Sequence, residues 1–108
     1  MIKEMDSIEL ASRLEAGEEI KVVDIRNHAE LMHGVLPEAE HLPMHLIPLK
    51  INDLPKDKDV VLYCRSGARS YQATAYLAQQ GFANVYNLRG GIIHWVRSGF
   101  EIDAPTPA

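Results

Sequence analysis

Two apolar segments in the second half of the chain are each followed by a helical pattern, and this alternation limits the fold more than any other feature. "DVVLYC" (59–64) precedes "RSYQATAYLAQQG" (69–81), and "NVYNL" (84–88) precedes "GGIIHWVRSG" (90–99). Short runs rich in β-branched and aromatic residues are typical of strands, and a glycine after apolar periodicity ends a helix. Strands that alternate with helices predict an α/β fold of three layers, α/β/α, around a mainly parallel sheet.

The first quarter of the chain continues this pattern. "DSIELASRLEAG" (6–17) predicts a helix, because Asp6 is a suitable cap, Glu9 follows three residues later, and apolar residues recur at helical spacing. "IKVVDIR" (20–26) predicts a strand buried on both faces. Both elements therefore fit the same α/β architecture.

The middle of the chain, residues 27–58, holds most of the prolines and histidines and has weaker periodicity. We expect a short helix at 28–33, a strand end at 40–44, and a helical turn at 44–51 that is broken at Pro48. This region predicts short irregular elements.

Composition limits the function as well as the size. The chain has 108 residues, 46% of them hydrophobic, which fits one domain with one modest core. A net charge of −4 with 11 lysines and arginines argues against a nucleic-acid partner, which would need clustered excess cations. No apolar run approaches the roughly 20 residues of a membrane span. We therefore expect a cytoplasmic monomer that uses neither nucleic acid nor membrane.

The only cysteine, Cys64, follows a predicted strand and precedes a predicted helix. One cysteine excludes an intramolecular disulfide framework and a multi-cysteine metal site, which leaves an inert core thiol or a reactive one. Arg65 and Arg69 flank the loop, and Gly67 allows its backbone amides to turn inward as an anion-binding nest. Ligands of parallel sheets bind at such strand-to-helix loops, so we favour a reactive thiol.

Ionisation of this thiol needs help from its surroundings. An unperturbed cysteine with a pKa near 8.5 is only about 3% thiolate at pH 7, and half ionisation requires roughly 2 kcal/mol. A helix N-terminus supplies about 0.3 to 1 kcal/mol. We expect the two arginines to supply the rest, and the loop amides to stabilise the charge on an anionic substrate that Cys64 attacks.

Other polar groups have a plainer interpretation. Asp24 and Arg26 lie at the end of a predicted strand, and we favour a structural pair that braces the cysteine loop over a catalytic one. His41 and His45 have helical spacing, but Pro43 lies between them and no other ligand is near in sequence. We therefore predict no metal and no other cofactor.

The segment from Val60 to Gly99 resembles the rhodanese homology domain in its single-domain sulfurtransferase form. The resemblance rests on the strand, Cys64-Arg65-Ser66-Gly67-Ala68-Arg69-Ser70, and "ATAYLAQQGFANVYNLRGGIIHW". "VVDIR" and "AELMHGVLPEAEHLP" extend it toward the N-terminus. Leu31, Val35 and Glu38 depart from the family pattern, as does Phe100-Glu101. We expect one rhodanese-like domain over residues 1–103 and a disordered tail over 104–108.

The resemblance implies a five-stranded parallel sheet and a two-step sulfur transfer. Cys64 would take the outer sulfur of a donor such as thiosulfate as a persulfide and pass it to cyanide or to a thiol such as thioredoxin. The amides of residues 65–69 would cradle the sulfur, and the arginines would hold the leaving sulfite. The predicted binding residues are Arg65, Ser66, Gly67, Ala68, Arg69 and Ser70.

Two other functions stay open at this stage. The related cell-cycle phosphatase fold has five residues between its cysteine and arginine, whereas four lie between Cys64 and Arg69. The tighter loop favours sulfur over a tetrahedral phosphate, against a phosphatase or arsenate reductase. A binding module or persulfide sensor without turnover is the second alternative, because some rhodanese-like domains lack the cysteine.

Overall fold

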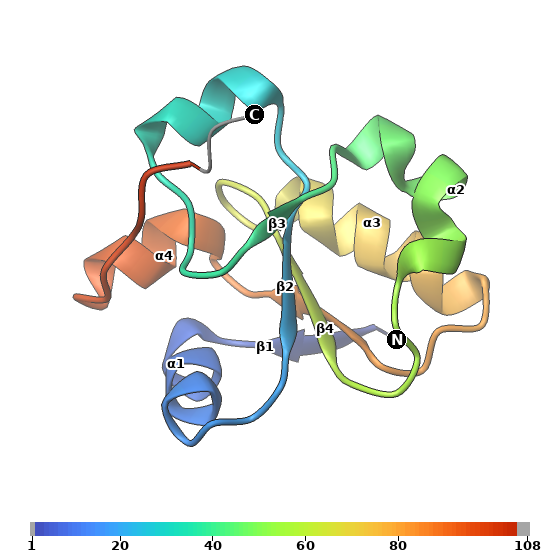
Figure 1. The fold of residues 1–108 in the computed structure, drawn as a ribbon, viewed down its shortest axis with the longest axis horizontal. Helices are drawn as coiled ribbons and strands as arrows, with labels where there is room; N and C mark the ends of the chain where they lie inside the picture. Colours follow the sequence, from blue (N-terminus) through green and yellow to red (C-terminus); the bar gives the residue numbers. More distant parts are fainter. Residues whose placement is uncertain (1, 106–108) are drawn as a thin grey trace.

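The computed structural model describes residues 2–105 and contains one five-stranded sheet in the order β1-β5-β4-β2-β3 (Figure 1). Every pair of neighbouring strands is parallel. The strands are β1 (Lys3–Met5), β2 (Lys21–Asp24), β3 (Glu40–His41), β4 (Val60–Tyr63) and β5 (Val85–Leu88). The predicted parallel α/β/α fold is therefore confirmed.

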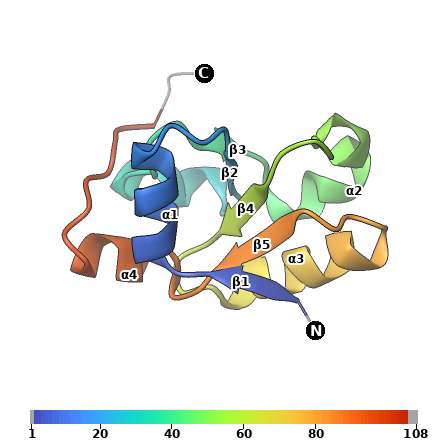
Figure 2. The ribbon, with the colours of Figure 1, turned by 90° about the horizontal axis from the view of Figure 1, so that it is seen from below.

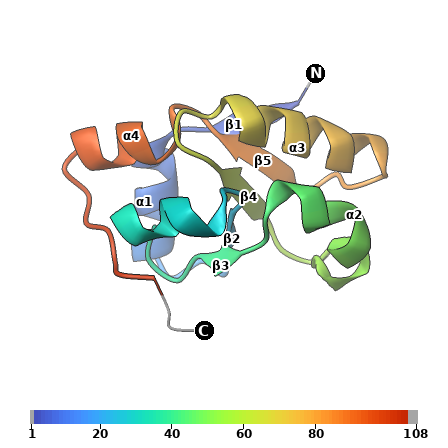
Figure 3. The ribbon, with the colours of Figure 1, turned by 90° about the horizontal axis from the view of Figure 1, so that it is seen from above.

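Helices cover both faces of the sheet. The α-helices are α1 (Ser7–Glu15), α2 (Ile47–Lys50), α3 (Ala68–Gln79) and α4 (Gly91–Arg97). Short 3₁₀ helices complete the chain as η1 (His28–His33), η2 (Met44–Leu46) and η3 (Ile51–Asp53). Figures 2 and 3 show α1 and α4 on one side of the sheet and α2 and α3 on the other. No helix among residues 2–105 is long and apolar enough to span a membrane.

Alternation along β4 divides the core into two clusters. Val60, Leu62 and Cys64 belong to the cluster under α2 and α3, whereas Val61 and Tyr63 belong to the cluster under α1 and α4. Strand side chains point to opposite faces in turn, so a strand covered on both faces is apolar at every position. Cys64 thus leaves the sheet on the α3 side.

Three local differences separate the sequence predictions from the structure. Strand β1 was not predicted, because three residues carrying two charges give no strand pattern. Strand β3 covers only Glu40–His41 of the predicted 40–44. Pro48 does not break a helix but lies in the first turn of α2, where its missing N–H costs nothing. Of the predicted tail, residues 106–108 lie outside the described part of the chain.

Candidate active site

Cys64 directly follows β4, at the carboxyl ends of the parallel strands. Tyr63 pairs in register with Asp24 of β2, and α3 begins four residues after the cysteine. The loop therefore lies where parallel α/β sheets bind ligands. Of the predicted residues 64–70, residues 64–67 connect β4 to α3 and residues 68–70 form the first turn of α3.

The backbone of the loop is held from outside by the start of α4. The carbonyl oxygens of Cys64 and Arg65 accept hydrogen bonds from the amides of Ile92 (3.0 Å) and Ile93 (3.2 Å). A Cβ on Gly91 would lie 2.4 Å from the Arg65 oxygen, so only glycine allows this approach. Because the carbonyls point toward α4, the amides of the loop are free to face the sulfur.

A backbone amide and a hydroxyl of the loop contact the cysteine sulfur. The amide of Gly67, whose φ of +99° is left-handed, lies 3.1 Å from Sγ, and the hydroxyl of Ser70 lies 3.4 Å from it. Cys64 is only 1% exposed, and Ser70 is fully buried. The sulfur is thus shielded from solvent within the loop.

The pKa of the Cys64 thiol lies below its ordinary value. Burial is the largest influence and raises this pKa, but hydrogen bonds from the Ser70 hydroxyl and from the amides of Ser70, Gly67 and Arg69 together lower it more. Hydrogen bonds to the charged form favour the thiolate. The loop amides and the Ser70 hydroxyl therefore lower the pKa of Cys64, an effect that the sequence had led us to expect from the arginine side chains.

The sequence did not predict a series of hydrogen-bonded side chains that extends from Ser70 through Asn87 to Glu4. The Ser70 hydroxyl lies 2.6 Å from Oδ1 of Asn87, and Nδ2 of Asn87 donates to Glu4 at 2.9 Å. Glu4 and Asn87 are paired across β1 and β5. This pairing fixes the orientation of the Asn87 amide, so its oxygen faces Ser70 and competes with Cys64 for the single hydroxyl proton. Only knowledge of the strand order could have revealed it.

The two loop arginines differ in their surroundings. Both terminal nitrogens of Arg69 donate to the Glu30 carboxylate, at 2.8 and 2.7 Å. The hydrogen bonds that Arg69 donates to Glu30 are the main reason that the Arg69 pKa is raised, and the negative charge of Cys64 adds to it. Arg65 is exposed and has no ion-pair partner among residues 2–105. Arg65 is thus the more available cation for an incoming anion.

Asp24 and Arg26 form a buried ion pair next to the loop. The guanidinium of Arg26 donates to both Asp24 oxygens and to the carbonyl of Gly34, at 2.7 to 3.1 Å. It also lies over the ring of Tyr63, 5.6 Å from the centroid. Neither side chain contacts Cys64. This geometry suits the bracing role better than the catalytic one.

Grooves flank the loop on both sides and carry most of the arginines. A groove of about 600 Å³ includes Arg26, Arg65 and Arg97, and a second groove of about 370 Å³ includes Ser66, Ala68 and Arg89. With Arg69, five of the six arginines in the chain gather at this end of the sheet. Planar guanidinium groups suit oxyanions, so this end of an acidic protein favours anions.

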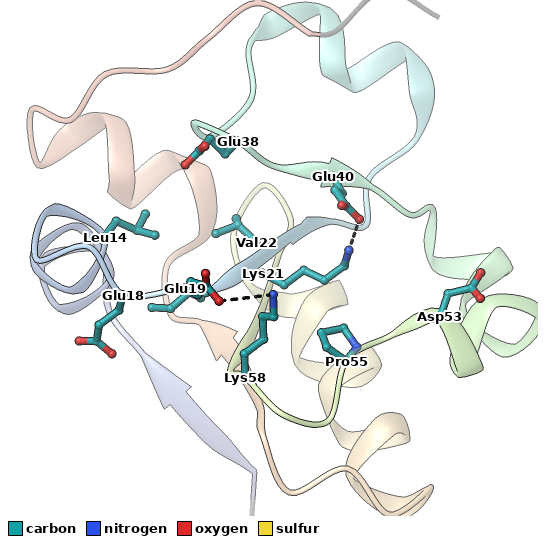
Figure 4. Close-up of a pocket in the computed structure, with 11 residues that line it drawn as sticks. Leu14, Glu18, Glu19, Lys21, Val22, Glu38, Glu40, Asp53, Pro55 and Lys58 are labelled. Atoms are coloured by element: carbon teal, nitrogen blue, oxygen red, sulfur yellow. Dashed lines mark hydrogen bonds and ion pairs between the residues drawn. The ribbon is translucent and has the colours of Figure 1, made fainter.

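The opposite ends of the strands form an acidic groove (Figure 4). Lys21 pairs there with Glu40, and Lys58 lies 3.9 Å from Glu19. The acidic side chains in its lining are Glu18, Glu19, Glu38, Glu40 and Asp53. No group of three possible metal ligands was found among the described residues. This groove holds no nucleophile and is separate from Cys64.

Comparison with known proteins identifies the family. The rhodanese-like domain family matches residues 7–98. The chain belongs to this family. It is 58% identical over 105 residues to a sulfurtransferase from Allochromatium vinosum, covering 97% of this chain and 98% of that protein. It is 40% identical over 89 residues to a tRNA uridine(34) hydroxylase from Hamiltonella defensa, covering 77% of this chain and 25% of that enzyme.

A solved structure of a rhodanese-like domain protein from Staphylococcus aureus superimposes with a TM-score of 0.86 at 28% identity, covering 97% of this chain and all of that one. Within this rhodanese-like domain, two departures from the family pattern, Glu38 and Val35, lie at well-defined places in the backbone. Glu38 replaces a glycine and has a left-handed φ of +60°, with its side chain exposed. Val35 replaces a histidine and forms a backbone bridge with Asp103.

Proposed function

We propose that this protein is a sulfurtransferase that carries a sulfane sulfur on Cys64, taken from thiosulfate or a similar donor and passed to cyanide or a thiol. The observation that carries the proposal is the pair of donors on Sγ, the Gly67 amide and the Ser70 hydroxyl, in a loop beside exposed Arg65. Donors fixed before reaction stabilise negative charge on sulfur without reorganisation.

The reaction has two balanced steps. The Cys64 thiolate attacks the outer sulfur of thiosulfate, the sulfur–sulfur bond breaks, and sulfite leaves with the bonding electrons. Arg65 stabilises this leaving group, while Arg69, held by Glu30, keeps the end of the loop in place. The loop amides hold the persulfide anion until cyanide or a thiolate attacks its outer sulfur and restores the Cys64 thiolate.

A turnover assay tests the proposal. Wild-type protein with thiosulfate and cyanide should form thiocyanate through many cycles, and Cys64→Ser should abolish it, since a serine hydroxyl cannot form the persulfide. Arg65→Ala should raise the thiosulfate KM more than it lowers kcat. Wild-type turnover by Cys64→Ser would show that the wrong nucleophile was chosen.

The same assay separates the alternatives. A persulfide sensor would load one sulfur and release it without cycling. A phosphatase would hydrolyse an aryl phosphate and ignore thiosulfate. Insertion of one residue between Cys64 and Arg69 should favour phosphate-ester hydrolysis; a gain of sulfur transfer on insertion would contradict the argument from loop size.

A further inference from the structure

Two buried acceptors share one hydroxyl proton behind the cysteine. The hydroxyl of Ser70 lies 2.6 Å from Oδ1 of Asn87 and 3.4 Å from Sγ of Cys64. A hydroxyl has one proton, so it donates fully to only one of these atoms at a time. The contact with Asn87 is a short O–H···O hydrogen bond, whereas a neutral thiol sulfur is a weak acceptor. Beside the neutral thiol, the Ser70 proton therefore points to Asn87.

The acceptor on Asn87 is fixed in place. Its Nδ2 donates to Glu4 at 2.9 Å, and an ionised carboxylate only accepts hydrogen bonds, so the amide oxygen must face Ser70. Glu4 and Asn87 are also paired in register across β1 and β5, and Arg89 lies 3.6 Å from the second oxygen of Glu4. Asn87 is only 2% exposed. The amide thus offers Ser70 a rigid, buried acceptor.

The thiol and the thiolate make different demands on Ser70. The S–H of the neutral thiol donates to the Ser70 oxygen while the Ser70 hydroxyl donates to Asn87, and every group is paired. The thiolate has no proton and needs the one on Ser70, which leaves the Asn87 oxygen unpaired, because Ser70 is its one donor in the described part of the chain. An unpaired buried acceptor costs free energy. Asn87 therefore disfavours the thiolate.

The persulfide does not carry this cost. Its negative charge lies on the outer sulfur, and Sγ is then bonded to carbon and to sulfur. A sulfur with two such bonds is a weak acceptor, like that of a thioether. Ser70 can keep its hydrogen bond to Asn87 in this state. Of the two anionic forms of Cys64, only the free thiolate competes with Asn87 for the proton.

We propose that Asn87 is a positioning residue that holds the Ser70 hydroxyl away from the free thiolate and so favours the sulfur-loaded form of Cys64. In loading, the thiolate attacks the outer sulfur of thiosulfate, the sulfur–sulfur bond of the donor breaks, and sulfite leaves with the bonding electrons. The effect on loading rests on the proposed sulfurtransferase function. The effect on the thiolate does not.

The charges around the sulfur stay constant when Asn87 is replaced, because its amide is neutral. The elements packed around the loop carry ionisable groups, some of them ion-paired with one another. They are Arg65 in the loop, Arg69 of α3, Glu30 of η1, Asp24 and Arg26 at the end of β2, His94 and Arg97 of α4, Glu4 of β1, and Arg89 after β5. A substitution at position 87 therefore changes the acceptor and leaves this set intact.

The first test is the pH profile of alkylation by iodoacetamide, without any sulfur donor. Asn87→Leu and Asn87→Val remove the acceptor, the first at similar size and the second with a residue suited to a strand. Each should raise the ratio of thiolate to thiol about fivefold, the effect of one hydrogen bond, and move the midpoint down by about 0.7 pH unit. Thermal unfolding shows which variants are folded.

Two controls isolate the hydroxyl. Asn84→Ala removes a nearby amide that donates to the carbonyls of Pro55 and Lys58, at 2.8 and 2.6 Å, and should leave the profile unchanged. In a Ser70→Ala background, Asn87→Leu should have no further effect, because the shared proton is already gone. A purely structural role for Asn87 would instead loosen Ser70 and move the midpoint up, as Ser70→Ala does.

The second test is the equilibrium of loading at fixed ratios of thiosulfate to sulfite, measured by intact mass. The equilibrium constant of Asn87→Leu should be about fivefold below wild type at a pH above both alkylation midpoints. It should equal that of wild type below both midpoints, where the free form is the neutral thiol.

The outcomes separate this inference from the proposed function. A midpoint that stays or rises in the Asn87 variants, or a shift that persists without the Ser70 hydroxyl, would overturn the inference. A lower midpoint with an unchanged loading constant would overturn its second half. If wild type took no sulfur from thiosulfate while the midpoints moved as expected, the sulfurtransferase proposal would fail and the role of Asn87 toward the thiolate would stand.

Discussion

Replacement of Ser70 by alanine tests the origin of thiol activation most sharply. Ser70 is fully buried at the start of α3, and its hydroxyl lies 3.4 Å from Cys64 Sγ and 2.6 Å from Oδ1 of Asn87. Alanine removes this hydroxyl but keeps the backbone amide, which also lowers the pKa of Cys64. The substitution therefore isolates one contribution to the thiolate.

The magnitude follows from the hydrogen-bond geometry. A hydrogen bond to a charged acceptor contributes about 1.5 to 3 kcal/mol. The contact to Sγ is long and the hydroxyl shares its proton with Asn87, so we expect a contribution at or below the bottom of this range, about 1 to 1.5 kcal/mol. Since 1.36 kcal/mol corresponds to a factor of ten, the ratio of thiolate to thiol at neutral pH should fall by about fivefold to tenfold.

The assay is the rate of alkylation by iodoacetamide as a function of pH. Ser70→Ala should move the profile to higher pH and lower the neutral rate, and the rates should converge where both thiols are fully ionised. Thr74→Val is the matched control, because it removes a buried hydroxyl one turn further along α3 that donates to the carbonyl of Ser70. A Ser70→Ala profile that coincides with those of wild type and Thr74→Val would refute a role for the hydroxyl.

Three further predictions concern the supports of the site. In Gly91→Ala the new Cβ would lie 2.4 Å from the oxygen of Arg65. The substitution should therefore lower the free energy of unfolding by about 1 to 3 kcal/mol and reduce thiocyanate formation at least tenfold. Unchanged urea denaturation and unchanged turnover would contradict this. Hydrogen bonds from Arg69 lower the pKa of Glu30 from about 4.5 to about 2, so their stabilisation is complete above pH 4.5 and is lost as the pH falls toward 2. Glu30→Gln should flatten that part of the stability curve by less than about 1 kcal/mol, since the pair is partly exposed, and a curve parallel to wild type would argue against the pair. Glu38→Gly should raise the free energy of unfolding by about 0.5 to 1 kcal/mol, because glycine adopts the left-handed φ of this position without strain. A lower melting temperature of the variant would show that the exposed Glu38 side chain stabilises the protein by more than the backbone strain costs.

The sequence was sufficient to predict the fold where the strand and helix patterns were long. Strands followed by helices predicted the parallel sheet and placed Cys64 at its carboxyl edge. The helix expected at 28–33 is present as η1, although as a 3₁₀ helix. Strand β1 could not be predicted, because three residues at a sheet edge are defined by pairing with β5 and not by their own pattern.

The residues of the cysteine loop could be predicted from the sequence, but the residues that contact the loop from other elements could not. Local spacing brings Gly67 and Ser70 to the sulfur, so residues 64–70 could be chosen from the sequence. Glu30 lies 39 positions before Arg69, and Asn87 lies 17 positions after Ser70, and only the packing of η1 and β5 brings them together. The sequence also could not show why position 91 requires glycine, because the close approach of Gly91 to the Arg65 carbonyl arises only in the tertiary structure.

The central claim is that the lone thiol is an ionised sulfur carrier. Intact-mass spectrometry after incubation with thiosulfate tests it most directly, with Cys64→Ser as the control. We predict the mass of one added sulfur on the wild-type chain, located at Cys64, removed by cyanide, and absent from the variant. A wild-type mass unchanged after incubation, or a sulfur that Cys64→Ser also acquires, would contradict the account.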